Sequence, residues 1–169
     1  MGESGSGKTT IADLLEQKYG LTQVRSYTTR SPRTPDECSH TFVTVEEFNQ
    51  LDDFVAYTFF DGNYYGATAQ QIDTHNVFVV DPYGVQYFKE HYHGDKIPIV
   101  IYLSVPFEER FNRMLQRGDS VFKATMRLQH DSKVFSNALD IADYVIENNH
   151  VDTSVEAILN IVNQFMTFL

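Results

Sequence analysis

The feature that most constrains this chain is a glycine-rich segment at residues 2–9, which reads GESGSGKT. It matches the pattern G-x-x-x-x-G-K-[ST] in full. Ile11, Leu14 and Leu15 then recur at helical spacing, and Gly20 is suited to end that helix. The pattern therefore predicts a loop that runs directly into the N-terminus of a helix, which is the usual architecture of a phosphate-binding loop.

The chemistry of such a loop follows from its residue types. Glycines let successive backbone N–H groups point to one side, where they and the positive end of the helix surround a phosphate. In this pattern Lys8 bridges the β- and γ-phosphates of ATP, and the Thr9 hydroxyl is a ligand of Mg²⁺. The predicted ATP-binding residues of the loop are Gly2, Ser4, Gly5, Ser6, Gly7, Lys8, Thr9 and Thr10.

Only Met1 precedes the loop, whereas a phosphate loop normally follows a buried parallel strand. Either the chain has lost its first strand by truncation, or its core is completed in another way. We expect truncation, which would put the activity of this form of the chain in doubt.

Three apolar runs without alternation follow, at residues 77–80, 97–105 and 144–146. Runs of this kind are typical of strands buried on both faces of a parallel sheet. Helical segments are predicted between them at 85–91 and 106–117, and an amphipathic helix at 155–168. The chain is thus predicted to be α/β, with the three-layer fold of a P-loop NTPase and a mostly parallel sheet.

Residues 28–68 differ from the rest. They contain turn residues at 31–36, a short β-like run at 41–45, a possible helix from Glu46, and an aromatic stretch interrupted by Asp61-Gly62-Asn63. This pattern predicts a small α+β insertion that carries a ligand surface.

Charge and cysteine content narrow the functional classes. The net charge of −10 opposes nucleic-acid or membrane-surface binding, and no segment is apolar enough to span a bilayer. A single cysteine excludes an internal disulfide and favours a cytoplasmic setting. All arginines nevertheless fall in two windows, residues 25–33 and 110–127, which suits two sites for a small phosphorylated ligand.

Three further motifs follow the loop in order: SYTTRSPR at 26–33, TFVTVEEF at 41–48 and GNYYG at 62–66. With the loop, they resemble the guanylate kinase family over almost the whole chain. The resemblance implies transfer of the γ-phosphoryl group of Mg·ATP to GMP. It also implies a core at 1–27 and 69–169, an acceptor-binding insertion at 28–68 and a lid at about 117–127.

The same resemblance implies roles for individual residues. Arg30 and Arg33 would clamp the acceptor phosphate with Tyr65 and with His40, which stands where the family has a tyrosine. Ser26 would contact the base, and Asp81 would lie near the acceptor and the metal waters. The lid arginines would be Arg113, Arg117 and Arg127, which with Lys8 stabilise the transferred phosphoryl group, and Asn148 would lie near the adenine.

Two positions depart from the family pattern. Ala56 stands where a glutamate usually reads the guanine edge, and Ala67 where a hydroxyl usually contacts the base. Lost hydrogen bonds of this kind relax selectivity. The acceptor could instead be another nucleoside monophosphate or ribose 1,5-bisphosphate. A phosphopeptide-binding module is the rival from another class, and the intact loop opposes it. We expect nucleotides as partners and a monomer or homodimer.

Overall fold

Two stretches far apart in sequence, residues 1–19 and 99–169, form one unit in the computed structural model, and residues 20–98 form another. The structure describes residues 1–32, 34–60 and 62–166. The boundaries between these two units differ from the predicted boundaries between the core and the insertion. That residues 28–68 bind the acceptor stays a prediction.

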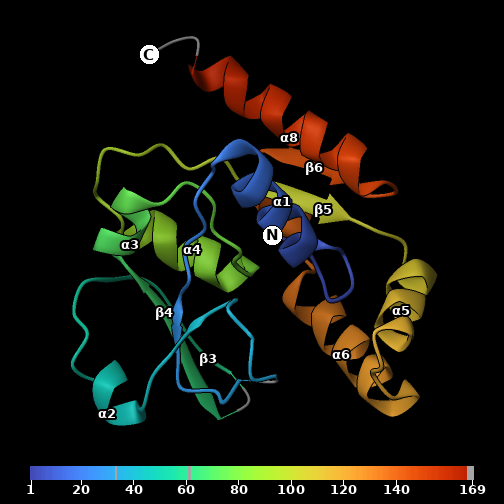
Figure 1. Cartoon of the computed structure of the whole chain (residues 1–169), viewed down its shortest axis with the longest axis horizontal. Coiled ribbons are helices and arrows are strands. Elements are labelled where there is room, and N and C mark those ends of the chain that lie inside the picture. The colour runs from blue at the N-terminus through green and yellow to red at the C-terminus, as the bar shows by residue number, and fades with distance from the viewer. Residues whose placement is uncertain (33, 61, 167–169) are drawn as a thin grey trace. The chain divides into compact units, whose positions relative to one another are not determined.

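The first unit contains the glycine loop and most of the helical residues (Figure 1). Its elements are α1 (Lys8–Tyr19), β5 (Ile101–Ser104), α5 (Phe107–Gln116), α6 (Val121–Val134), α7 (Ala138–Ile141), β6 (Tyr144–Glu147) and α8 (Val151–Met166). The predicted segments 106–117 and 155–168 correspond to α5 and α8, except that residues 167–169 lie outside the described chain.

Strands β5 and β6 pair in parallel, in register from Ile101 with Tyr144 to Ser104 with Glu147. Met1 lies along β5, because the Leu103 amide donates to the Met1 carbonyl at 2.9 Å. The sequence predicted that β6 would be buried on both faces, and this is wrong for one face, where Val145 is half exposed. In the described chain β6 pairs with β5 alone, so it is an edge strand.

The helices of this unit bury one stripe each. Helix α1 buries Ile11 and Leu15 and contacts α8, which buries Val155 and Ile158 and runs across β6 (Figure 1). Helices α5 and α6 pack through the buried cluster Met114, Ala124 and Leu128. These apolar stripes at helical spacing determine which side of each helix is buried.

The second unit is built on a four-stranded sheet in the order β2-β1-β4-β3. Its elements are β1 (Tyr27–Thr28), β2 (Thr41–Phe42), α2 (Val45–Phe48), β3 (Phe54–Phe60), β4 (Asn63–Thr68), α3 (Ala69–Thr74) and α4 (Pro82–His91). The aromatic stretch of the predicted insertion lies in the antiparallel pair β3–β4. Capping boxes at Thr44 and Thr68 begin α2 and α3.

The predicted buried strand at 77–80 does not form a strand. Val77 makes a single parallel bridge with Gln23, and the Val24 amide donates to the Val77 carbonyl at 2.8 Å. An apolar run becomes a strand only where a partner continues alongside it, and here the ladder ends after this bridge.

No helix within the described residues is both long enough and apolar enough to span a membrane.

Candidate nucleotide site

The glycine loop adopts a conformation that only glycine accommodates at two points. Gly5 and Gly7 have φ angles of 80° and 88°. A Cβ atom on Gly5 would lie 2.7 Å from the Arg110 carbonyl oxygen, and one on Gly7 would lie 2.6 Å from Nδ2 of Asn148. Helix α1 begins at Lys8 directly after this turn, so its first amide groups and positive end face the loop. The sequence prediction of a loop running into a helix is confirmed.

Lys8 is held by backbone oxygens of the loop. Its Nζ atom donates to the Gly2 carbonyl at 2.5 Å and to the Glu3 carbonyl at 2.9 Å. Burial lowers the pKa of Lys8 to about 8, an effect opposed by the Asp131 carboxylate and reinforced by the charge of Arg127. A polyphosphate that replaced these carbonyls would meet an ammonium group that lacks strong hydration.

Asn148 braces the loop from the other side. Its side chain is fully buried, with Nδ2 donating to the Ser6 carbonyl at 2.8 Å and Oδ1 accepting from Ser154 Oγ at 2.8 Å. Both ends of the amide are therefore occupied by protein groups. The predicted contact with adenine stays a prediction, and the structure adds a role in fixing the loop.

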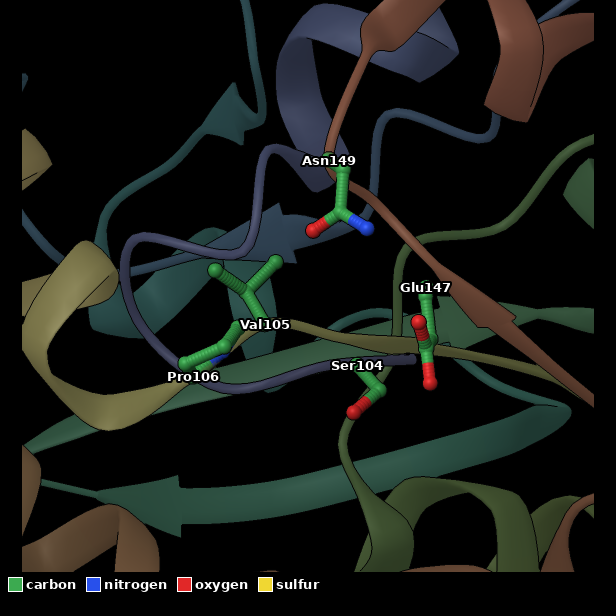
Figure 2. A pocket seen from close by; sticks show the side chains of 5 residues that line it. All are labelled: Ser104, Val105, Pro106, Glu147 and Asn149. Carbon is green, nitrogen blue, oxygen red and sulfur yellow. The ribbon is translucent and has the colours of Figure 1, made fainter.

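A cavity of about 190 Å³ lies at the carboxyl ends of β5 and β6, where it is lined in part by the chain neighbours of this asparagine (Figure 2). It is lined by Ser104, Val105, Pro106, Glu147 and Asn149. Ligands of parallel α/β sheets bind at this edge.

The predicted lid arginines differ in their contacts. Arg113 lies on the loop, donating from Nη2 to the Asn148 carbonyl at 3.0 Å and from Nε to Glu109 at 3.1 Å. Arg117 pairs with Asp119 just beyond α5. The charges of Arg127 and Arg117 both lower the pKa of Lys8, so these two arginines act electrostatically on the predicted catalytic lysine. Arg113, the fourth predicted catalytic residue, reaches the loop through its Nη1, 3.5 Å from the Gly5 carbonyl. Thr9 and Thr10 are exposed in the first turn of α1.

Sequence reasoning missed the carboxylates that hold the loop. Glu3 accepts from Tyr102 Oη at 2.5 Å and pairs with Nη2 of Arg110 at 3.1 Å, and Asp131 accepts from the Ser4 amide at 2.5 Å. Arg110 is buried and structural rather than part of an anion site, with its Nε donating to the Val105 carbonyl. For Asp131 a signal existed, because it lies four residues after Arg127 on one helical face.

The predicted acceptor residues lie in the second unit. Arg30 makes a bidentate pair with Glu37, at 2.7 Å from Nη2 to Oε1 and 3.2 Å from Nη1 to Oε2. Ser39 Oγ donates to the same carboxylate at 2.8 Å. Glu37 and the Tyr65 hydroxyl raise the pKa of Arg30. Arg33, the other predicted clamp, lies outside the described residues.

Of the remaining predicted acceptor residues, Ser26 and His40 form a polar pair and Asp81 caps a helix. Ser26 is buried with its Oγ 3.0 Å from Nδ1 of His40, whose ring meets the Tyr65 ring edge-on at 5.7 Å. Asp81 caps α4 by accepting from the Gly84 amide at 2.7 Å. Its predicted role near the acceptor stays a prediction.

Ala56 and Ala67, at the positions where the family usually reads the base, have apolar surroundings in the structure. Ala56 and Ala67 are directly paired across β3 and β4 and are buried with Val24, Val55 and Ile72. Asp61 and Asp73 are candidates to replace the missing glutamate. Asp61 lies outside the described residues, and Asp73 accepts from Tyr92 Oη at 2.6 Å.

A glycine loop opening a helix, a parallel β5–β6 pair and a group of arginines around one lysine define a P-loop phosphotransferase. The family model for guanylate kinase matches residues 1–165. The chain belongs to the guanylate kinase family, whose members are nucleoside monophosphate kinases.

Individual relatives agree with this assignment. The chain is 34% identical to the guanylate kinase of Chlamydia abortus, covering 94% of this chain and 82% of that protein. It is 33% identical to that of Wolbachia pipientis wMel, with 95% and 86% covered. The crystal structure of guanylate kinase from Anaplasma phagocytophilum superposes with a TM-score of 0.64 at 25% identity, covering 96% and 82%. The predicted P-loop α/β fold is thereby confirmed.

Proposed function

We propose that this chain transfers the γ-phosphoryl group of ATP to the phosphate of GMP, giving ADP and GDP. The observation that carries the proposal is the arrangement of the glycine loop, Lys8, Arg113 and Arg127 in one unit, in a chain that belongs to the guanylate kinase family. The acceptor is assigned to the second unit, which contains Arg30, Tyr65, Ser26 and His40, with Arg33 predicted to join them.

The reaction is an in-line displacement. An oxygen of the acceptor phosphate attacks the γ-phosphorus, the bond from that phosphorus to the β,γ-bridging oxygen breaks, and ADP leaves. No general base is needed, because a phosphate dianion is already a nucleophile. Lys8, Arg113, Arg117 and Arg127 stabilise the charge spread over the transferred group, and Arg30 orients the acceptor. Closure of a lid at about residues 117–127 would exclude water, which otherwise would hydrolyse ATP.

Mg²⁺ fits the residues present. The Thr9 side chain is exposed in the first turn of α1, next to Lys8. The described residues contain no cluster of three or more His, Cys, Asp or Glu that would bind a metal by itself. This suits Mg²⁺, which is usually held by one or two protein oxygens together with substrate phosphates. When bound, the ion neutralises phosphate charge, and Thr9 would be its protein ligand.

We assign the adenine to the cavity beside Asn148. The carboxylate of Glu147 and the hydroxyl of Ser104 line it, and both accept hydrogen bonds of the kind that an adenine amino group donates. The single cysteine and the use of ATP suit a cytoplasmic enzyme, either a monomer or a homodimer, with no role in nucleic-acid binding.

One observation favours a different acceptor. The paired alanines Ala56 and Ala67 offer no hydrogen bond to a guanine edge. Another nucleoside monophosphate or ribose 1,5-bisphosphate would need no such reader. The braced loop and Lys8 count against the third candidate, a phosphopeptide-binding module.

A coupled ADP-release assay with Mg·ATP tests these candidates. The acceptors are GMP, dGMP, AMP, CMP, UMP, dTMP and ribose 1,5-bisphosphate. We expect turnover with GMP and dGMP alone. Turnover with a different acceptor would replace the substrate and keep the mechanism. Binding of ATP without turnover of any acceptor would overturn the proposal in favour of a binding module.

A further inference from the structure

We propose that Asp131 is a positioning residue that joins helix α6 to the phosphate loop and so holds Arg127 in place for phosphoryl transfer. The proposal rests on the proposed function, since it concerns the same reaction. Asp131 has no role in the pattern of phosphate-binding residues, and its carboxylate contacts the loop backbone at the Ser4 amide.

The first observation is a buried hydrogen bond between distant parts of the chain. Asp131 is 8% exposed, and its Oδ2 accepts from the Ser4 amide at 2.5 Å. A buried carboxylate is costly unless it is paired or hydrogen-bonded, so this contact resists loss. It connects a residue in the last turns of α6 with the turn of the loop, where the Ser6 amide donates to the Glu3 carbonyl.

The second observation is the spacing within α6. Asp131 and Arg127 are four residues apart, and side chains at this spacing lie on the same helical face. Both charges act on Lys8: the Asp131 carboxylate raises the pKa of the lysine, and the Arg127 guanidinium lowers it. A contact that fixes Asp131 against the loop therefore also fixes where Arg127 stands relative to Lys8.

The third observation is that the loop is rigid at the point where Asp131 meets it. Glu3, the neighbour of Ser4, is anchored by Tyr102 from β5 and by Arg110 from α5, the ion pair being about nine-tenths buried. Helix α6 is thus tied to a fixed backbone and not to a mobile one. The helix that carries Arg127 is therefore held at its C-terminal end, which matters because catalysis of this kind depends on preorganised charge.

A double-mutant cycle tests the proposal. The variants are Asp131→Ala, Arg127→Met and the pair, with Asp131→Asn as a second variant that keeps the size and an acceptor oxygen. Asp140→Asn, an exposed aspartate of α7, is the matched control for lost charge. Each protein is assayed for kcat, the KM of GMP and the affinity for Mg·ATP, and its thermal unfolding is recorded.

We expect Asp131→Ala to lower kcat roughly 10- to 100-fold, with the KM of GMP unchanged. In the Arg127→Met background the same substitution should change kcat less than about threefold, because the residue through which it acts is absent. Asp131→Asn should lie between wild type and Asp131→Ala, and Asp140→Asn should match wild type.

Independent losses that multiply in the double variant would overturn the proposal and leave Asp131 a purely structural residue. If Asp131→Ala does not fold, the cycle is run with Asp131→Asn. If the wild-type chain binds Mg·ATP but phosphorylates no acceptor, the proposed function fails by itself. The coupling of Asp131 to Arg127 is then read in the ATP affinities, where additivity again contradicts it.

Discussion

Lys8 in the first unit and Arg30 in the second are held in different ways. Lys8 donates to the Gly2 and Glu3 carbonyls, although two arginines of the same unit, Arg113 and Arg117, are paired with carboxylates. In the second unit Arg30 is paired bidentately with the carboxylate of Glu37. The two carbonyl oxygens that Lys8 contacts are neutral and do not cancel its charge, and the carboxylates of Asp131 and Glu3 act on it only through the electrostatic field. A carboxylate in direct contact, as at Arg30, already supplies the geometry and charge that a phosphate would bring.

Phosphate binding therefore has different consequences at the two sites. A polyphosphate at the loop gains an ammonium group whose charge burial has made costly, as its lowered pKa shows. A phosphate at Arg30 must displace Glu37 or share the guanidinium with it. We therefore expect the first site to respond strongly to loss of its cation and the second to respond to loss of its internal anion.

The largest effect is expected for Lys8→Met. The variant should lower kcat roughly 10²- to 10³-fold, because it removes a preorganised charge from the transferred phosphoryl group. The ADP-release assay at saturating substrates measures this. Lys18→Met, an exposed lysine in the last turn of the same helix, is the matched control and should keep wild-type activity. A loss of less than threefold in Lys8→Met would show that the loop lysine is not catalytic.

The next effect is a pH dependence of stability. The pKa of Lys8 is about 8 in the folded chain against 10.5 ordinarily, because of burial. Between these values the unfolded chain binds more protons, so the contribution of Lys8 to the free energy of unfolding should rise as pH increases from about 8 to 10.5. Below pH 8 lysine is charged in both states, and the cost of burying that charge is present in full.

Urea unfolding of wild type and Lys8→Met at several pH values measures this contribution as a difference. At pH 7 the free energy of unfolding should be higher for Lys8→Met than for wild type. By pH 10 this difference should change by about 1–3 kcal/mol in favour of wild type. A gap that is independent of pH would mean that the ammonium group is well solvated, and the contrast between the two units would lose its basis.

The smallest effect is expected for Glu37→Gln. Without the competing carboxylate, the KM of the acceptor should fall roughly two- to fivefold, as expected for an ion pair worth ~0.5–1 kcal/mol, while the KM of ATP stays constant. Initial-rate kinetics with varied acceptor give the value. Glu46→Gln, an exposed glutamate of α2, controls for net charge. A rise in the acceptor KM would instead make Glu37 a residue that positions Arg30.

Several parts of the fold were predictable because they depend on local sequence. The loop and α1 follow from glycine positions and helical spacing, and the aromatic run broken by turn residues indicated β structure where β3 and β4 form. The run at 77–80 shows the limit. Its composition is that of a buried strand, yet strand formation also requires a partner, and composition does not say whether one continues alongside.

The site divides along the same line. Residues 2–9 and the helical spacing after them were enough to predict the loop with Lys8 at its end, because glycines that adopt positive φ angles and a following helix impose that geometry. Packing set the partners of the two candidate sites: Asp131 on the Ser4 amide, Asn148 on the Ser6 carbonyl, and Glu37 on Arg30. The first two contacts join residues more than a hundred positions apart. In the third, Glu37 is one of several carboxylates with which an arginine could pair. Such choices are made by how helices and strands pack, because a single residue type fits many partners and packing selects one.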